Sequence, residues 1–296
     1  MTADDLRRNS DNFCYRHPDR QSFVLCQRCL RTICPECQTP AAVGVICPEC
    51  LRDQQKAASP AQRKAERRWS RSRPVAVADT RPLVTYSIIG ITLFVYLLTL
   101  IPGIGSTIQQ NLLYFGPALY PELTGRFEPW RLLTVALVHG SFFHVGLNML
   151  ALWMIGRSLE PLLGRWRFVT LYLLSALGGS VAVTLLSFLT PVVGASGAIF
   201  GIFGALFVIG RHIGANIGGI AIILAVNLAI GFVPGFNVSW QAHVGGLLTG
   251  LLVAFIFTRT RSRERRGLQI ALLVAVFLGL VALLLVPVFA PGLVLR

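Results

Sequence analysis

Four polar residues in the apolar part of the chain have side chains that could perform acyl transfer. Ser196 lies in "GASGAIFG", His243 lies in "AHVGG", and His144 and Asn148 lie four residues apart in "HGSFFHVGLN". A serine hydroxyl becomes a nucleophile when a neighbouring base takes its proton, and neutral imidazole suits that role near pH 7. A lone serine in an apolar helix is more often a small packing residue. Other features of the sequence are therefore needed to show whether Ser196 is a packing residue or a nucleophile.

His144 and Asn148 share one face of a helix, because residues four apart lie one above the other. Both side chains could donate hydrogen bonds to one oxygen, together with the backbone N–H of Ser196, which lacks an intrahelical partner at a helix start. Donors arranged in this way form an oxyanion hole for an acyl-transfer intermediate.

A third member of a serine triad is absent from the membrane part of the sequence. No aspartate follows Asp79, and we expect the later glutamates to lie in loops: Glu122, Glu128, Glu160 and Glu264. The residues therefore predict a dyad, with Ser196 as nucleophile and His243 as base. We expect packing to orient the imidazole, and Phe200, one turn after Ser196, is the candidate for that contact.

The composition places these residues in a multi-pass membrane protein. Of 296 residues, 54% are hydrophobic and only 14% are charged, which is unlike a soluble domain. About 20 apolar residues cross a bilayer, and somewhat shorter segments suffice inside a bundle. Seven segments qualify: 83–101, 141–162, 167–189, 196–212, 216–233, 240–258 and 268–290. The connection 102–140 carries four prolines, so we expect it to lie irregularly in the membrane interface.

Glycines predict that segments 196–212 and 240–258 approach each other closely. They recur on both segments, as Gly197, Gly201, Gly204, Gly246 and Gly250. Small residues on facing membrane helices let the backbones come together. This approach would place Ser196 within hydrogen-bond reach of His243.

The arginines between the segments set an orientation by the positive-inside rule. They cluster at 157–167, at Arg211 and at 259–266, on the same side as the N-terminus. We expect that side to be the cytosol, because residues 1–13 lack the apolar core of a signal peptide. The candidate catalytic residues then converge near the outer face. This clustering favours a shared site, and it disfavours a transporter, whose polar groups trace a path across the membrane.

A separate metal-binding module is predicted near the N-terminus, since all seven cysteines lie between Cys14 and Cys50. They form four pairs with two-residue spacers: Cys14 and His17, Cys26 and Cys29, Cys34 and Cys37, Cys47 and Cys50. Eight such ligands suit two tetrahedral zinc sites, and a cytosolic segment disfavours disulfides. The pairs could combine sequentially or interleave, first with third and second with fourth. We favour the interleaved arrangement, which resembles B-box-type zinc fingers.

Two structural zinc ions would supply much of the stability of this module, because fewer than about 40 residues cannot build a sufficient core. Residues 51–82 contain "RKAERRWSRSR" and three prolines, which indicates a basic linker that is either a solvated tether or held against anionic lipid. The module offers few arginines and no evident reading helix. We therefore expect a cytosolic protein partner for it and no nucleic acid.

The motifs together resemble the rhomboid intramembrane serine proteases over roughly residues 83–258. "GASGAIFG" and "AHVGG" are preceded by "WR" at 130–131 and by "HGSFFHVGLN" at 139–148, four motifs in the family's order. The resemblance implies a six-helix core, Ser196 as nucleophile and His243 as base. It further implies that His144 and Asn148 donate to the oxyanion. By the same resemblance, Trp130 and Arg131 are structural residues of the first loop.

The same resemblance implies that segment 216–233 is a lateral gate for substrates. Phe200 replaces a tyrosine common in some relatives, which removes one hydroxyl and leaves ring stacking open. The seventh segment, 268–290, resembles the extra C-terminal helix of some family members.

The predicted fold is thus an all-α polytopic membrane protein preceded by a small zinc-binding domain. Its predicted parts are an N-terminal arm 1–13, a double zinc-binding B-box-like module 14–50, a basic cytosolic linker 51–82, a six-helix rhomboid protease domain 83–258, a basic cytosolic loop 259–267, and an extra transmembrane helix and tail 268–296.

The predicted function is a serine endopeptidase of the cell membrane that cleaves transmembrane segments of other proteins near the outer face. It would contact membrane lipids and need no cofactor for catalysis. The alternative is an inactive relative that binds membrane clients without cutting them. Such relatives generally lack the nucleophile or the base, whereas this sequence has Ser196 and His243.

Overall fold

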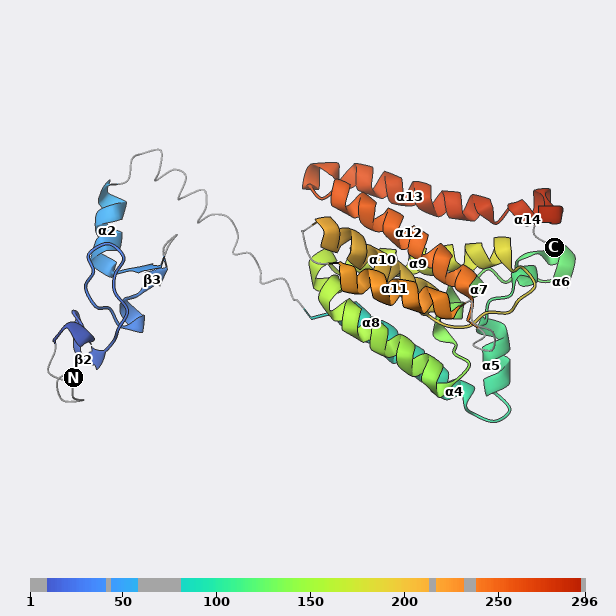
Figure 1. The fold of residues 1–296 in the computed structure, drawn as a ribbon, viewed down its shortest axis with the longest axis horizontal. Helices are drawn as coiled ribbons and strands as arrows, with labels where there is room; N and C mark the ends of the chain where they lie inside the picture. The colour runs from blue at the N-terminus through green and yellow to red at the C-terminus, as the bar shows by residue number, and fades with distance from the viewer. Residues whose placement is uncertain (1–9, 41–43, 58–80, 213–216, 232–237, 294–296) are drawn as a thin grey trace. The chain divides into compact units, whose positions relative to one another are not determined.

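The computed structural model describes residues 10–40, 44–57, 81–212, 217–231 and 238–293 (Figure 1). The chain divides into two compact units, Met1–Asp79 and Thr80–Arg296. The first unit contains the cysteine pairs, and the second contains the apolar helices.

Short hairpins and turns build the N-terminal unit. Its elements are η1 (Ser10–Asn12), β1 (Phe13–Cys14), β2 (His17–Gln21), η2 (Pro35–Cys37), β3 (Thr39–Pro40), β4 (Val45–Ile46) and α2 (Pro48–Ala57). β1 pairs antiparallel with β2, and β3 pairs antiparallel with β4. The core consists mainly of cysteines, with Ile33 and Ile46 as the buried aliphatic residues. So small an apolar core is consistent with stabilisation by bound metal.

Helix α2 extends seven residues into the segment that we expected to be linker from residue 51 onward. Residues 51–57 contain neither glycine nor proline, and most of them are good helix formers. Leu51 also packs against the cysteine core, which holds the helix to the module. The remainder of the expected linker, residues 58–80, lies outside the described residues.

The C-terminal unit is a bundle of apolar helices that follows the predicted segments. They are α4 (Leu83–Thr99), α8 (Phe142–Leu163), α9 (Arg165–Leu186), α10 (Ser196–His212), α11 (Gly218–Ile230), α12 (Trp240–Arg259), α13 (Arg266–Leu283) and the short α14 (Val286–Phe289). Each of the seven predicted segments corresponds to one helix, and α14 continues the last one beyond a break. The fold class inferred from the sequence is confirmed.

Three of the described helices are long and apolar enough to cross a membrane alone: Arg165–Leu186, Trp240–Arg259 and Arg263–Phe289. A fourth span arises if Arg131–Leu137 and Phe142–Leu163, which meet at 97°, count as one. Leu83–Thr99, Ser196–His212 and Gly218–Ile230 are shorter apolar helices. Such lengths suit helices inside a bundle, where the neighbouring helices supply apolar surroundings.

Helices α9, α10 and α12 pack at the centre of the bundle through small residues. A Cβ atom added at Gly246 would lie 2.6 Å from the carbonyl carbon of Gly197, and one at Gly250 would lie 2.5 Å from that of Gly201. On the other side of α12, a Cβ at Gly178 of α9 would lie 3.1 Å from the carbonyl oxygen of Gly245. The glycine pattern therefore brings α10 against α12, as we expected.

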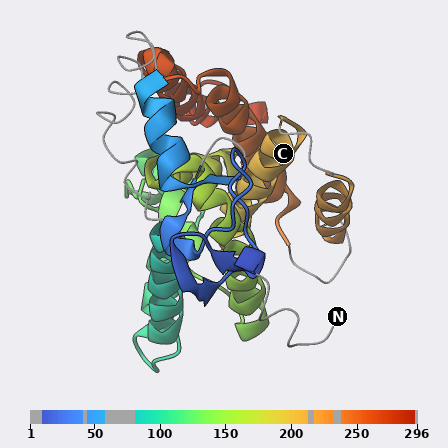
Figure 2. The same cartoon turned by 90° about the vertical axis from the view of Figure 1, so that its left-hand side faces the viewer.

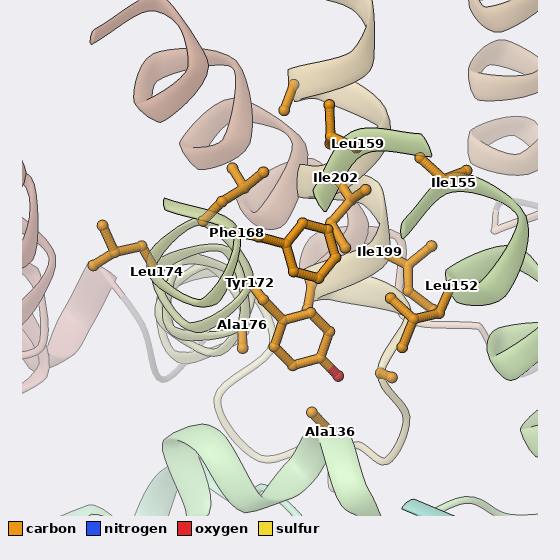
Figure 3. Packing of buried hydrophobic residues seen from close by; sticks show 14 of the residues in the cluster. Ala136, Leu152, Ile155, Leu159, Phe168, Tyr172, Leu174, Ala176, Ile199 and Ile202 are labelled. Atoms are coloured by element: carbon orange, nitrogen blue, oxygen red, sulfur yellow. The ribbon is translucent and has the colours of Figure 1, made fainter. Parts of the chain in front are cut away.

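The main apolar core lies where α8, α9 and α10 meet (Figure 3). α9 contributes Phe168 and Tyr172, and α10 contributes Ile199 and Ile202. Leu152, Leu159 and other residues of α8 close this core on the opposite side. Packing in this core therefore fixes the first turns of α8 and α10 relative to each other.

The connection between α4 and α8 is irregular, as predicted. It contains α5 (Gly105–Leu112), η3 (Gly116–Leu119), α6 (Pro121–Thr124), α7 (Arg131–Thr134) and η4 (Val135–Leu137). Buried Arg131 holds it together, because its guanidinium pairs with Glu128 at 2.5 Å and donates to the carbonyls of Gln110 and Leu113. Trp130 Nε1 donates to the carbonyl of Asn111. Both residues of the "WR" motif thus link distant parts of this loop.

Glu160 lies within helix α8, so its expected loop position was wrong. Its carboxylate is 1% exposed and accepts from the backbone N–H groups of Val84 and Thr85 and from the hydroxyl of Thr85. The first N–H groups of a helix have no intrahelical partner, and a carboxylate is the acceptor that they favour. The tertiary contact with α4 keeps this charge buried.

Two helices lie at the margin of the bundle. α11 has no buried residue, and Figure 2 shows it standing apart at the edge. α13 runs beside α12 in Figure 1, and Gln269 is its only buried residue. Most of the apolar surface of these two helices is left for lipid or for another protein segment to cover.

Candidate active site

Ser196 opens helix α10, and neighbouring segments hold the two residues before it, one through a backbone carbonyl and the other through a histidine side chain. The N–H of Gly194 donates to the carbonyl of Val135, and the N–H of Ala195 donates to Nε2 of His139 at 3.3 Å. His139, which lies just before α8, therefore fixes the loop in front of the serine. The N–H of Ser196 is the first of the helix, a position without an intrahelical acceptor.

His243 lies in the first turn of α12, where the side chain of Ser239 caps the helix by accepting from the N–H of Ala242. The imidazole is 5% exposed and stacks on the ring of Phe200, with centroids 4.0 Å apart and planes 12° apart. Its Nδ1 has no hydrogen-bond partner among the described residues. Packing against Phe200 orients this ring, as the absence of a carboxylate partner led us to predict.

The backbones next to Ser196 and His243 lie in contact. A Cβ atom added at Gly197 would lie 3.2 Å from the carbonyl oxygen of Ala242. Gly197 follows the serine directly, and Ala242 directly precedes the histidine. The close approach of α10 and α12 therefore places the first turns that carry Ser196 and His243 against each other at one end of the bundle.

His144 and Asn148 lie on the first turns of α8. The side chain of Ser141 caps this helix by accepting from the N–H of His144. Asn148 is 8% exposed, and its Nδ2 donates to the carbonyl of His144 at 2.8 Å. An amide nitrogen carries two hydrogens, so a second one is left to donate elsewhere.

Gly194 lies between the imidazole of His144 and the hydroxyl of Ser196. A Cβ atom there would meet His144 Nε2 at 2.7 Å and Ser196 Oγ at 3.8 Å, and its φ of +121° is one that glycine adopts readily. The His144 ring also meets the His139 ring edge-on, with centroids 5.0 Å apart. His144, which belongs to α8, thus lies beside Ser196 of α10.

A small cavity of about 20 Å³ opens next to Ser196. α9 and the α4–α8 connection supply much of its lining; the lining residues include Tyr114, Val135, Gly179, Ser180, Val183, Gly194 and Ser196. We did not single out Tyr114 or Ser180 from the sequence. Neither belongs to a spacing pattern. Ser180 lies on α9, and Tyr114 reaches the site only because the connection folds back onto that helix.

The cysteine pairs of the N-terminal unit form two groups. Cys14, His17, Cys34 and Cys37 make one, Cys26, Cys29, Cys47 and Cys50 make the other, and the ligand atoms of each lie within 4.8 Å of one another. This is the interleaved arrangement that we favoured. All seven cysteines are free of disulfides.

The distances inside both groups fit tetrahedral zinc. With zinc about 2.3 Å from each sulfur and about 2.1 Å from nitrogen, neighbouring ligand atoms lie about 3.6–3.8 Å apart. His17 Nδ1 lies 3.7 Å from the sulfur of Cys14 and 3.4 Å from those of Cys34 and Cys37, and the sulfurs of Cys29 and Cys47 are 3.8 Å apart. His17 therefore presents Nδ1, a detail that spacing did not predict.

The protonation of the thiols also fits a cation site. Burial raises the pKa of Cys14, but hydrogen bonds from the backbone of Cys34 and Arg16 outweigh it and lower the pKa to about 6. Burial and the neighbouring cysteine sulfurs raise the pKa of Cys37 to about 11. Such crowded thiolates repel one another until a cation binds among them.

Comparisons with known proteins identify the family of this chain. The family model described as "Rhomboid domain" matches residues 126–260, which include the four motif stretches. The chain is 35% identical over 209 residues to Rhomboid protease GluP of Bacillus subtilis, covering 67% of this chain and 40% of that protein.

Two other relatives extend the comparison. Putative rhomboid protease YdcA of Bacillus subtilis is 34% identical over 46% of this chain and 71% of its own length. Rhomboid protein 1, mitochondrial, of Saccharomyces cerevisiae is 30% identical over 67% of this chain and 60% of its own. The chain therefore aligns with less than two thirds of GluP and of the yeast protein. The matched domain, the apolar helices and the similarity to YdcA together establish that this chain belongs to the rhomboid family of multi-pass membrane proteins.

Proposed function

We propose that this protein is an intramembrane serine endopeptidase in which Ser196 is the nucleophile and His243 is the general base. The observation that carries the proposal is the backbone contact between Gly197 and Ala242, which brings the first turns of α10 and α12 together. The names of the relatives GluP and YdcA, which include "protease", support the same class of reaction.

In the proposed reaction, Ser196 Oγ attacks the carbonyl carbon of the scissile peptide bond while its proton passes to His243. The oxygen of the tetrahedral intermediate accepts hydrogen bonds from His144, from the second N–H of Asn148 and from the N–H of Ser196. The C–N bond then breaks, and the leaving amine takes the proton from His243. A water molecule, deprotonated by His243, attacks the acyl-enzyme and releases Ser196.

The substrates are transmembrane segments of other membrane proteins, which enter laterally past α11. Of the helices around the site, α11 is suited to this gating role because no residue on it is buried. A helix held by few contacts opens at low energetic cost. By the positive-inside rule the site faces the outer side of the cell membrane, and the N-terminal unit lies in the cytosol.

The N-terminal unit, from Cys14 to Cys50, binds two structural zinc ions in the two interleaved groups. When bound, zinc replaces the apolar core that so short a segment lacks. A cytosolic protein is the partner that we propose for it, and residues 51–82 connect it to the protease domain at 83–258.

The decisive experiment is covalent labelling with a fluorophosphonate, in which Ser196 Oγ displaces fluoride from phosphorus. We expect an adduct on Ser196 in detergent-solubilised protein, and none in Ser196→Ala or His243→Ala. Ser158→Ala, an exposed serine of α8, is the control and should label normally. Cleavage of a panel of single-pass membrane segments should follow the same pattern.

Absence of any adduct in the folded native protein would instead favour the alternative function, an inactive relative that binds membrane clients without cutting them. That alternative predicts stable association with transmembrane segments in native protein and in Ser196→Ala alike.

A further inference from the structure

The seventh helix, α13, is anchored at both ends although almost none of it is buried. At its start, Gln269 accepts from Nε of Arg167 at 2.9 Å and donates to the hydroxyl of Thr260 at 2.7 Å. This contact ties the beginning of α13 to the start of α9 and to the end of α12. It lies at the opposite end of these helices from the candidate active site, since Ser239 and His243 mark the start of α12.

The end of α13 carries a second polar anchor, on the side of the active site. The hydroxyl of Tyr120, in the α4–α8 connection, donates to the carbonyl of Leu284 at 2.6 Å. Pro287 lies just after the break, near the start of α14, and has no N–H to donate to the carbonyl of Leu283 four residues earlier. The N–H of Val288 donates to Leu285 instead of Leu284. The break between α13 and α14 thus leaves the Leu284 carbonyl oriented to accept from Tyr120.

Tyr120 also belongs to the apolar cluster that supports the lining of the cavity at Ser196. It is 7% exposed and packs on Phe188 with ring centroids 5.5 Å apart. Both rings belong to one apolar cluster, against which Leu284 and Val286 also pack. Several members of this cluster line the cavity directly, namely Tyr114, Val135, Val183, Val192 and Ala242.

Contacts of Tyr114 extend this series of contacts toward Ser196. Its backbone pairs with that of Val192 through two hydrogen bonds of 2.9 Å, and its hydroxyl contacts Thr184 of α9 at 2.5 Å. Val192 lies four residues before Ser196. An unbroken series of contacts therefore joins the end of α13 to the loop that presents the serine.

We propose that Tyr120 is a positioning residue. Its hydrogen bond to the end of the seventh helix holds the loop 114–120 and the cavity wall in place beside Ser196. The seventh helix then contributes to the geometry of the active site, although it carries no catalytic residue. This inference rests on the proposed function, because the positioned group is the proposed nucleophile.

The test measures the rate of fluorophosphonate labelling at Ser196 against thermal stability, in full-length Tyr120→Phe. We expect the inactivation rate constant to fall about three- to tenfold, the effect of one lost hydrogen bond, with the reversible binding constant of the probe unchanged. Tyr86→Phe removes the hydroxyl of an exposed tyrosine on α4 and should label at the native rate.

A second variant makes the result specific to the helix break. Pro287→Ala restores a backbone N–H, lets the helix continue, and gives the Leu284 carbonyl a helical partner in Val288. We expect it to slow labelling as well, and the double variant with Tyr120→Phe should be no slower than either single variant. Additive effects would show that Tyr120 and the helix end act separately, and would overturn the proposal.

Hydrogen exchange of the peptide spanning residues 114–124 separates this inference from the proposed function. Faster exchange in Tyr120→Phe, together with slower labelling, is the expected result. A native labelling rate per folded molecule in Tyr120→Phe, while Ser196→Ala abolishes labelling, overturns the positioning role and leaves the protease function standing. If native protein does not label at all, the protease function fails, and unchanged exchange in Tyr120→Phe then removes the loop-holding role too.

Discussion

At the scale of single residues, the candidate site relies on packing and backbone contacts in place of a charged third member. The flat stack of His243 on Phe200, with planes 12° apart, fixes the imidazole without a carboxylate. His139 holds the N–H of Ala195 and so fixes the approach to Ser196. Each of these contacts joins different segments of the chain, so the geometry of the proposed dyad depends on the whole bundle.

Asn148 provides a prediction at this scale. Asn148→Ala removes one proposed donor to the oxyanion, and we expect turnover to fall about 100- to 1000-fold with little change in substrate binding. The measurement is the cleavage rate of a model transmembrane segment in detergent, with kcat and KM determined separately. Turnover near the native value would assign Asn148 a packing role alone, since its side chain also bonds the carbonyl of His144.

At the scale of elements, the contact between α10 and α12 has no room for side chains. A Cβ at Gly246 would come within 2.6 Å of the carbonyl carbon of Gly197, and that neighbour is backbone that cannot rotate away. Any larger residue must therefore separate the helices that carry Ser196 and His243. The distance between the proposed nucleophile and the proposed base depends on the same glycine as the stability of the bundle.

We predict that Gly246→Ala destabilises the protein by about 1–3 kcal/mol, the usual cost of overpacking, and slows labelling of Ser196. Gly279→Ala is the matched control, because a Cβ there meets nothing within 4 Å on α13. Thermal unfolding in detergent and the fluorophosphonate rate measure the two effects. A Gly246→Ala protein that unfolds and labels like native protein would contradict the tight α10–α12 contact.

At the scale of the whole molecule, the chain consists of two compact units that are stabilised in different ways. The helical unit buries a large apolar core, whereas the core of the N-terminal unit consists mainly of cysteines, which with His17 form two groups of metal-type ligands. In the proposed orientation, a hydrocarbon layer about 30 Å thick separates the zinc ions from the catalytic residues. The zinc unit then has no means of supplying a catalytic group.

We therefore predict that protein beginning at Pro82 still inserts into the membrane, still labels at Ser196 and still cleaves a generic transmembrane segment. Its choice among native substrates is expected to change if the cytosolic unit recruits them. A truncated protein that is folded but fails to label would show that the units are coupled across the membrane.

Metal analysis of the full chain should give two zinc ions per molecule. Cys34→Ser removes one ligand from the group that contains His17, so we expect the zinc content to fall toward one per molecule. Asp53→Ala, an exposed acid of α2 outside both groups, is the control and should keep two. Retention of two ions in Cys34→Ser would contradict the assignment of that group.

Much of this protein was determined by its sequence alone. Apolar segment lengths predicted the helices because crossing a bilayer requires about 20 apolar residues, whatever the neighbours are. The two-residue spacers predicted the ligand pairs, since that spacing directs two side chains to one metal. The motifs around Ser196, His243, His144 and Asn148 indicated the family that the comparisons establish.

Tertiary structure alone decided the features that depend on contacts between distant segments. Glu160 is buried because the start of α4 offers it N–H groups 75 and 76 residues away, which no local pattern reveals. Tyr114 and Tyr120 reach the surroundings of Ser196 only because the α4–α8 connection folds back against α9 and the end of α13. Periodicity and spacing report local geometry, whereas a buried polar group takes its partner from whichever segment packing brings within hydrogen-bond distance.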